Sequence, residues 1–101
     1  MTKAAVSVKI KPNVKLVEPP FYRVLYKNDE VTTMQFVVNS LIQYFGHTDE
    51  TATDLTELIH NNGSATVAVL PYEIAEQKMI EVMVFARSSG FPLQVTIEAD
   101  S

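Results

Sequence analysis

Hydrophobic and polar positions along this chain predict three short strands separated by longer segments. Residues 21–27 are rich in β-branched and aromatic side chains, and a cluster of turn-forming residues at 28–30 follows them. Residues 65–70 have the character of a buried strand, and residues 93–97 alternate between apolar and polar side chains. The segments between these strands are long enough for helices.

Helix start and stop signals divide the first long segment into two helices. Thr32 with Gln35 three residues later fits a capping box, so we expect a helix that ends at Gly46. Thr48 precedes two carboxylates and predicts the start of a second helix, with Gly63 beyond its end. The apolar stripe expected on this second helix consists of Ala52, Leu55 and Ile59.

A third helix is expected to begin at Pro71, because proline is favoured in the first turn, and to end before Gly90. The residues expected to face the core from this helix are Ile74, Ala75, Met79, Val82, Met83 and Ala86. The order β-α-α-β-α-β predicts a single-domain α/β sandwich of the α+β class, with three helices packed on a small antiparallel sheet.

The predicted domain spans residues 19–101, and residues 1–18 form a separate arm. Residues 6–10 alternate locally, but Pro12 interrupts the pattern and Pro19-Pro20 stiffens the join to the domain. We therefore expect residues 1–18 to form a flexible N-terminal arm.

Composition narrows the possible functions. The chain has 101 residues, 47% of them hydrophobic, and its lack of cysteine excludes disulfides, thiolate nucleophiles and cysteine zinc sites. Residues 1–27 hold six lysines and arginines against one glutamate, although the formal net charge is −4, so the remainder is strongly acidic. An acidic body disfavours nucleic acid and favours a cationic ligand. No apolar run could span a membrane, and we expect a cytoplasmic monomer without a metal or cofactor.

One group of residues has the chemistry needed to bind an amine beside an apolar side chain. Asn28, Asp29, Glu30 and His60 together supply an amide, two carboxylates and an imidazole, which suit a positively charged amino group. Thr56, Ile59 and His60 fall at i, i+3 and i+4 and share one helix face. The apolar residues next to the polar ones are Met34, Val37 and Ile59. The first residue of a protein chain combines the same two features.

Each of these residues also has a structural explanation when taken singly. A histidine near a helix end is commonly a surface or capping residue. Asn28 to Glu30 are also typical of turn and capping chemistry, and the apolar residues fit a core. The functional interpretation therefore depends on the wider sequence context.

That context resembles the ClpS adaptor proteins. Residues 19–38 read PPFYRVLYKNDEVTTMQFVV, which is similar to the family pattern P-P-x-Y-x-V-x-L-x-N-D-D-x-T-P-M-x-F-V. Further matches occur without gaps up to about residue 98. They are Ala52-Thr53, His60 with Gly63, residues 73–78, Ala86-Arg87 and residues 91–93.

The resemblance implies an adaptor that binds the N-terminal residue of substrate proteins. Such a destabilising first residue, an N-degron, would be Leu, Phe, Tyr or Trp. The adaptor would deliver its substrates to a Clp AAA+ ATPase-protease through the N-terminal domain of a ClpA-type or ClpC-type ATPase, in a bacterium or a plastid. The arm at residues 1–18 would be engaged by the ATPase during delivery.

The resemblance also assigns roles by position. Asn28 and His60 would bind the α-amino group, while Asp29 and Glu30 would supply a negative environment. Met34 would be the gatekeeper that disfavours β-branched first residues. Glu73 and Lys78 would dock on the ATPase. The pocket for the first side chain would be lined by Thr32, Met34, Val37, Thr56, Ile59 and Leu93.

Three positions depart from the family pattern. Thr56 replaces a usual methionine, so we expect weaker binding of Leu or a shift toward a larger or more polar first residue. Glu30 replaces an aspartate and lengthens the reach of the carboxylate. Thr33 replaces a proline at a helix start, which is a structural change.

Three alternatives stay open. The first is an interaction module that docks on the Clp ATPase but has an altered or lost N-degron pocket because of Thr56. The second is a piece of a ubiquitin ligase, which the absence of cysteine disfavours. The third is an enzyme, for which no H-E-x-x-H or G-x-S-x-G motif exists. Its candidate residues would be His47, His60, Asp49, Glu50 and Asp54.

Overall fold

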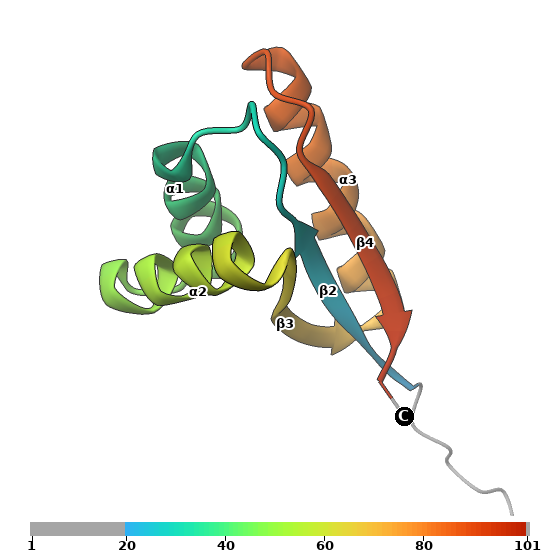
Figure 1. Ribbon diagram of the computed structural model, residues 1–101. Coiled ribbons are helices and arrows are strands. Elements are labelled where there is room, and N and C mark those ends of the chain that lie inside the picture. The colour runs from blue at the N-terminus through green and yellow to red at the C-terminus, as the bar shows by residue number, and fades with distance from the viewer. Residues whose placement is uncertain (1–19, 101) are drawn as a thin grey trace, which may run out of the picture.

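The computed structural model describes residues 20–100, which form three helices and three strands in the predicted order (Figure 1). The elements are β2 (Phe21–Lys27), α1 (Met34–Phe45), α2 (Asp49–Asn62), β3 (Ser64–Pro71), α3 (Tyr72–Ser88) and β4 (Gln94–Ala99). The predicted α+β class and its antiparallel sheet are confirmed. The predicted arm at residues 1–18 lies outside the described residues. No helix between residues 20 and 100 has the length and apolar character needed to cross a membrane.

β2 is the central strand of the sheet, whose order is β3-β2-β4. It pairs antiparallel with both neighbours, from Phe21 opposite Pro71 to Lys27 opposite Ser64 on one side. On the other side its last residue, Lys27, lies opposite Gln94. The end of β2, the start of β3 and the start of β4 therefore meet at one end of the sheet.

A β-bulge interrupts the pairing of β2 with β3. Val24 lies opposite Ala68 and Leu25 opposite Thr66, so Val67 is an extra residue on β3. The bulge changes the inward-facing register of β3, because Val67 and Ala68 both contact the core although they are adjacent in sequence. Val69 then points away and is 42% exposed, so the predicted buried strand is buried on one face only.

The helices cover one face of the sheet. α3 packs against all three strands, and α2 packs against α1 and β3 (Figure 1). Val24, Tyr26 and Val95 extend from the sheet into this layer and are almost completely buried. The phenyl ring of Phe36 on α1 lies 5.0 Å from that of Phe91, just before β4, which ties α1 to the region that follows α3.

The start of α1 differs from the prediction. Thr33, and not Thr32, is the N-cap, because the Thr33 hydroxyl accepts a hydrogen bond from the backbone N–H of Phe36. The Thr32 hydroxyl donates to the Asp29 carboxylate and is not available for capping. The predicted start of α2 is correct, since Thr48 accepts from the N–H of Thr51.

The predicted core face of α3 is wrong at one position. Ile74 is 45% exposed, whereas Ala75, Val82 and Ala86 are fully buried. The buried residues recur at helical spacing, and Ile74 precedes that stripe by one residue, which rotates its side chain toward solvent. Pro71 forms no side-chain cap, as expected for a residue without a polar side chain.

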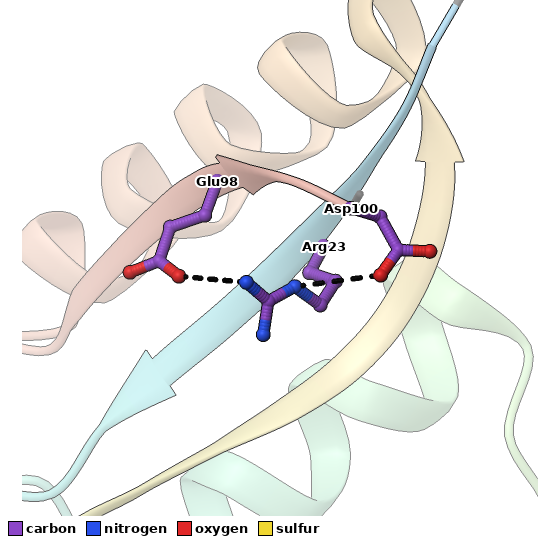
Figure 2. A network of polar contacts seen from close by, with 3 residues as sticks. All are labelled: Arg23, Glu98 and Asp100. Carbon is purple, nitrogen blue, oxygen red and sulfur yellow. Dashed lines mark hydrogen bonds and ion pairs between the residues drawn. The ribbon is translucent and has the colours of Figure 1, made fainter.

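Within residues 20–100, the face of the sheet opposite the helices carries a small charged network. Arg23 on β2 donates to Glu98 over 3.1 Å and forms an ion pair with Asp100 over 3.5 Å (Figure 2). All three side chains are more than one-third exposed. The network lies near the start of β2, at the end of the sheet away from residues 28–30.

Candidate functional site

The turn between β2 and α1 is built around the Asp29 carboxylate. Its Oδ1 accepts hydrogen bonds from the backbone N–H groups of Val31, over 2.8 Å, and Thr32, over 2.7 Å. Its Oδ2 accepts from the Thr32 hydroxyl over 2.7 Å. An aspartate that accepts from residues two and three positions later fixes a tight turn. The Asp29 carboxylate therefore fixes the conformation of this turn.

The hydrogen bonds also set the charge state of Asp29. Partial burial raises the pKa of its carboxyl, but the bonds from Thr32 and Val31 and the positive charge of Arg87 act in the opposite direction. The net result is a pKa below the ordinary value of 3.8. Asp29 is therefore ionised at neutral pH and adds a fixed negative charge next to Asn28.

The turn is joined to the end of α2 by one backbone contact. The N–H of Asn28 donates to the carbonyl of Gly63 over 2.9 Å. Gly63 has a φ of 87°, a left-handed conformation that favours glycine, and its own N–H donates to the carbonyl of Ile59. The contact places Asn28 beside the last turn of α2, which carries His60. The structure thus brings together two segments that lie 32 residues apart in sequence.

The polar side chains predicted to bind an amine remain exposed. Asn28, Glu30 and His60 are all on the surface. Within residues 20–100, their side chains form none of the hydrogen bonds or ion pairs that hold the fold. They are therefore accessible to a ligand, while Asp29 next to them is committed to the turn.

The predicted pocket residues differ in exposure. Val37, Thr56, Ile59 and Leu93 are between 1% and 6% exposed and belong to the buried layer, whereas Met34 is 46% exposed. Thr32 is half-buried. Met34, as the first residue of α1, supplies most of the exposed apolar surface of this group.

The Thr56 hydroxyl is satisfied inside its own helix. It donates to the carbonyl of Ala52, one turn earlier, over 2.8 Å. Because Thr56 is 4% exposed, this bond occupies the donor of a hydroxyl that would be costly to bury unpaired. To a neighbouring side chain Thr56 offers its methyl group, its small size and a hydroxyl oxygen that can still accept a hydrogen bond.

A buried chain of hydrogen bonds ends on the backbone carbonyl of Val37, and no sequence pattern predicted it. The Ser40 hydroxyl donates to the carbonyl of Val37 over 2.8 Å, and the Tyr26 hydroxyl lies 2.8 Å from the same Ser40 oxygen. Because the Ser40 proton is used, Tyr26 is the donor of that second bond. Burial raises the pKa of Tyr26, so its hydroxyl keeps this proton. A buried tyrosine and serine fourteen residues apart carry no pattern that predicts their pairing.

Three clefts lie on the described surface. One of about 410 Å³ is lined by Ile80, Met83, Val84 and Arg87, and a second of about 370 Å³ by Val31, Arg87, Gly90, Phe91 and Pro92. A third, of about 380 Å³, is lined by residues 71–74 at the start of α3. None of these clefts is lined by Thr56, Ile59 or His60.

The residues predicted to dock on the ATPase lie on α3. Glu73 is exposed in its first turn, and Lys78 is half-buried with its Nζ 3.9 Å from Glu81. Glu73 also lines the third cleft. The histidines and carboxylates of the enzyme alternative are not gathered, since residues 20–100 contain no group of three metal-ligating side chains suited to a metal ion. His47 bonds to the carbonyl of Val67 instead.

The sequence and the fold of this chain match those of known proteins. Residues 17–96 match the family model for the ATP-dependent Clp protease adaptor protein ClpS. The chain is 43% identical over 95 residues to the ATP-dependent Clp protease adapter protein ClpS of Rhodospirillum centenum, covering 94% of this chain and 86% of that protein. It is 37% identical over 95 residues to the adapter of the same name from Clostridium acetobutylicum, covering 94% of each.

A solved structure is also similar. Agrobacterium tumefaciens ClpS2 bound to L-phenylalaninamide superposes with a TM-score of 0.80 at 34% sequence identity. The match covers 82% of this chain and 100% of the solved one.

Proposed function

Because the chain belongs to the ClpS family of ATP-dependent Clp protease adaptor proteins, we propose that it binds the first residue of a substrate protein at the 28–30 turn. The observation that carries this proposal is the contact between Asn28 and Gly63, which joins the turn to the end of α2 beside His60. Exposed polar groups and buried apolar groups meet at this junction. A chain's first residue presents a charged amine and a side chain on adjacent atoms, so it fits both.

The polar half of the site binds the amine. Asn28 offers an amide oxygen and His60 a ring nitrogen, both of which accept hydrogen bonds from an ammonium group. Asp29, ionised within its turn, and Glu30 add negative potential around it. Each hydrogen bond to a charged group contributes roughly 1.5–3 kcal/mol. An acetylated amine has no charge and one donor, so it binds much more weakly.

The apolar half of the site takes the first side chain. L-phenylalaninamide, the ligand in the similar structure from Agrobacterium tumefaciens, has a free α-amine and a benzyl side chain. Burying a Phe or Leu side chain is worth about 1.5–3 kcal/mol. Together with the amine contacts, and after the cost of association, this supports micromolar to sub-micromolar affinity. Met34 lies at the exposed edge of this half, where it would crowd a branched Cβ.

Thr56 makes one wall of the proposed pocket shorter than a methionine would. Its hydroxyl proton is donated to Ala52, so toward a ligand the hydroxyl could act only as an acceptor. A threonine in place of a longer side chain leaves space on that side, which favours aromatic first residues over Leu. We therefore infer substrates that begin with Phe, Tyr or Trp, with Leu bound more weakly.

Delivery depends on a second surface, which we place on α3. Glu73 and Lys78 lie on this helix, away from the turn at residues 28–30, so a Clp ATPase of the ClpA or ClpC type can dock there while substrate is bound. The adaptor acts as a monomer in the cytoplasm. Residues 1–18 are the segment that the ATPase engages during delivery.

Fluorescence polarisation with peptides that differ only in residue one tests the proposal. The panel is Phe, Trp, Leu, Ile and Met with free amines, and Phe with an acetylated amine. Binding of free Phe and Trp with loss on acetylation supports the proposal. Equal binding of acetylated Phe, or no binding by any peptide, contradicts it.

A second candidate is an adaptor that docks on the ATPase through α3 without binding an N-degron. The nearly complete burial of Val37, Thr56, Ile59 and Leu93 is the observation that favours it. The same peptide panel, together with binding to a purified ATPase N-terminal domain, separates the two. ATPase binding without peptide binding supports this second candidate.

A further inference from the structure

Arg87, in the last turn of α3, lies between two clefts and connects them. It lines both the cleft formed by Ile80, Met83 and Val84 and the cleft that contains Val31, Phe91 and Pro92. The second cleft therefore brings the turn after β2 next to the connection between α3 and β4. Figure 1 shows these two connections rising beside each other at the same end of the sheet.

Two hydrogen bonds fix the connection between α3 and β4 to Arg87. Its Nη1 donates to the carbonyl of Phe91 over 3.1 Å and to the carbonyl of Leu93 over 2.8 Å. The segment between them has no regular secondary structure, and Pro92 has no N–H to donate. The guanidinium group of Arg87 therefore binds the carbonyl oxygens on both sides of Pro92.

The held segment carries a residue of the proposed pocket. Leu93 is 1% exposed and belongs to the same buried cluster as Val37 and Ile59. The backbone position of Leu93 decides where its side chain lies, and Arg87 sets that position. A loose segment would leave Leu93 mobile on the side of the pocket that faces β4.

Arg87 also lies near the 28–32 turn, because it lines the second cleft together with Val31. Its hydrogen bonds go to Phe91 and Leu93 on the other side of that cleft. Arg87 therefore fixes the segment that faces the turn, from the helix that carries the proposed docking residues.

We propose that Arg87 is a positioning residue for N-terminal recognition, which it supports by holding Leu93 in its binding position beside the 28–32 turn. This inference rests on the proposed function. It assigns to Arg87 no contact with the substrate: the two bonds from Nη1 are to the protein's own backbone. The effect of Arg87 is on pocket geometry.

The test compares three variants by fluorescence polarisation with a Phe-first peptide, well below their melting temperatures. Arg87→Met keeps the aliphatic stem and removes the donors, and its Kd is expected to rise about tenfold. Arg87→Lys keeps the charge on a shorter side chain, whose single ammonium would have to reach both carbonyls, so a rise of about threefold is expected. Arg23→Met is the matched control at the other end of the sheet, and its Kd is expected to stay unchanged.

A second measurement follows the pocket directly in the unliganded protein. The Leu93 methyl signals and the amide signals of Val31 and Thr32 are expected to shift or broaden in NMR spectra of Arg87→Met and, to a smaller extent, of Arg87→Lys. If Arg87→Met does not fold, the lysine variant carries both measurements. A loss of thermal stability with unchanged Kd and unchanged signals would mean a purely structural role.

The outcomes separate this inference from the proposed function. If the unaltered protein binds the peptide and the folded Arg87 variants bind it equally well, the positioning role is overturned and N-degron recognition stands. If the unaltered protein does not bind, the proposed function is overturned. The Leu93, Val31 and Thr32 signals then decide by themselves whether Arg87 holds these segments.

Discussion

The two ends of the sheet carry similar charged residues but use them differently. Near the start of β2, Arg23 is paired with Glu98 and Asp100, and these three side chains bond to one another in solvent. Near the end of β2, the Asp29 carboxylate accepts from backbone N–H groups and a hydroxyl, and Arg87 donates to backbone carbonyls. The charges at this second end shape the main chain.

The difference explains why one end is suited to binding. Exposed ion pairs contribute little to stability because water screens both partners. Charged groups that bond to the backbone fix the conformation of a loop and leave other side chains of that loop free to bind a ligand. Asn28, Glu30 and His60 therefore stay exposed on a rigid support. A site for a charged ligand needs this combination of fixed backbone and accessible polar groups.

The largest effect is expected from His60→Ala. His60 is exposed, so its loss should leave the melting temperature nearly unchanged while removing one hydrogen bond to the substrate amine. The Kd for a Phe-first peptide is expected to rise by about tenfold or more. Asn61→Ala, at the next exposed position, is the matched control and should bind normally. Equal Kd values for the two variants would remove His60 from the site.

The second largest effect is expected at Asp29, and it is measured as a loss of folding stability. Asp29→Ala removes three hydrogen bonds and is expected to lower the free energy of unfolding by about 2 kcal/mol and to weaken peptide binding. The folded pKa of Asp29 lies below its unfolded value of 3.8, so its stabilisation is complete above that value and is lost as the pH falls through the folded pKa.

Thermal melts at several pH values check this prediction. The difference in melting temperature between the unaltered protein and Asp29→Ala should be largest at neutral pH and should shrink below pH 3.8. Asp29→Asn, which keeps an acceptor oxygen, serves as the control and should lose less stability. A difference that stays constant down to strongly acidic pH would contradict the role of the ionised carboxylate.

A smaller effect is expected from Thr56→Met, which fills the space beside Thr56. One additional methylene contact is worth about 0.8 kcal/mol, so the affinity for a Leu-first peptide should improve about fourfold relative to a Phe-first peptide. Thr56→Val keeps the shape and removes the hydroxyl that bonds to Ala52. It should preserve the unaltered preference. A preference that changes in the valine variant would show that the hydroxyl contacts the ligand.

The smallest effect belongs to the other end of the sheet. Arg23→Met breaks two exposed ion pairs and is expected to change the free energy of unfolding by less than about 1 kcal/mol. Peptide affinity should not change. Chemical denaturation of the variant measures the first quantity and the peptide assay the second. A large loss of affinity would mean that the two ends of the sheet are coupled.

The sequence predicted the elements well because their signals are local. Glycines, a proline and capping threonines lie within a few residues of the boundaries that they set. The same locality explains the misassigned cap of α1. Thr32 and Thr33 both offer a hydroxyl, and the choice between them was made by Asp29, which binds the Thr32 hydroxyl in the turn.

Features that depend on distant residues were not predictable. The bulge at Val67 arises from pairing with β2, and the Tyr26–Ser40 bond joins a strand to a helix. Arg87 was noted only as part of a motif, because nothing in a pattern shows that it bonds to Phe91 and Leu93. The exposed candidates Asn28 and His60 were singled out by their chemistry, and the family resemblance then favoured a function, since each alone is an ordinary surface residue.

The bulge in β3 has a consequence for how copies of this protein meet one another. Among residues 20–100, β3 is an edge strand of the sheet, and a regular edge is a template onto which another chain can add a strand. An extra residue at Val67 bends that edge, and Pro71 at its end has no N–H to offer. A neighbouring molecule therefore finds only a short, kinked stretch to pair with, which protects a concentrated solution from sheet-to-sheet aggregation along this edge.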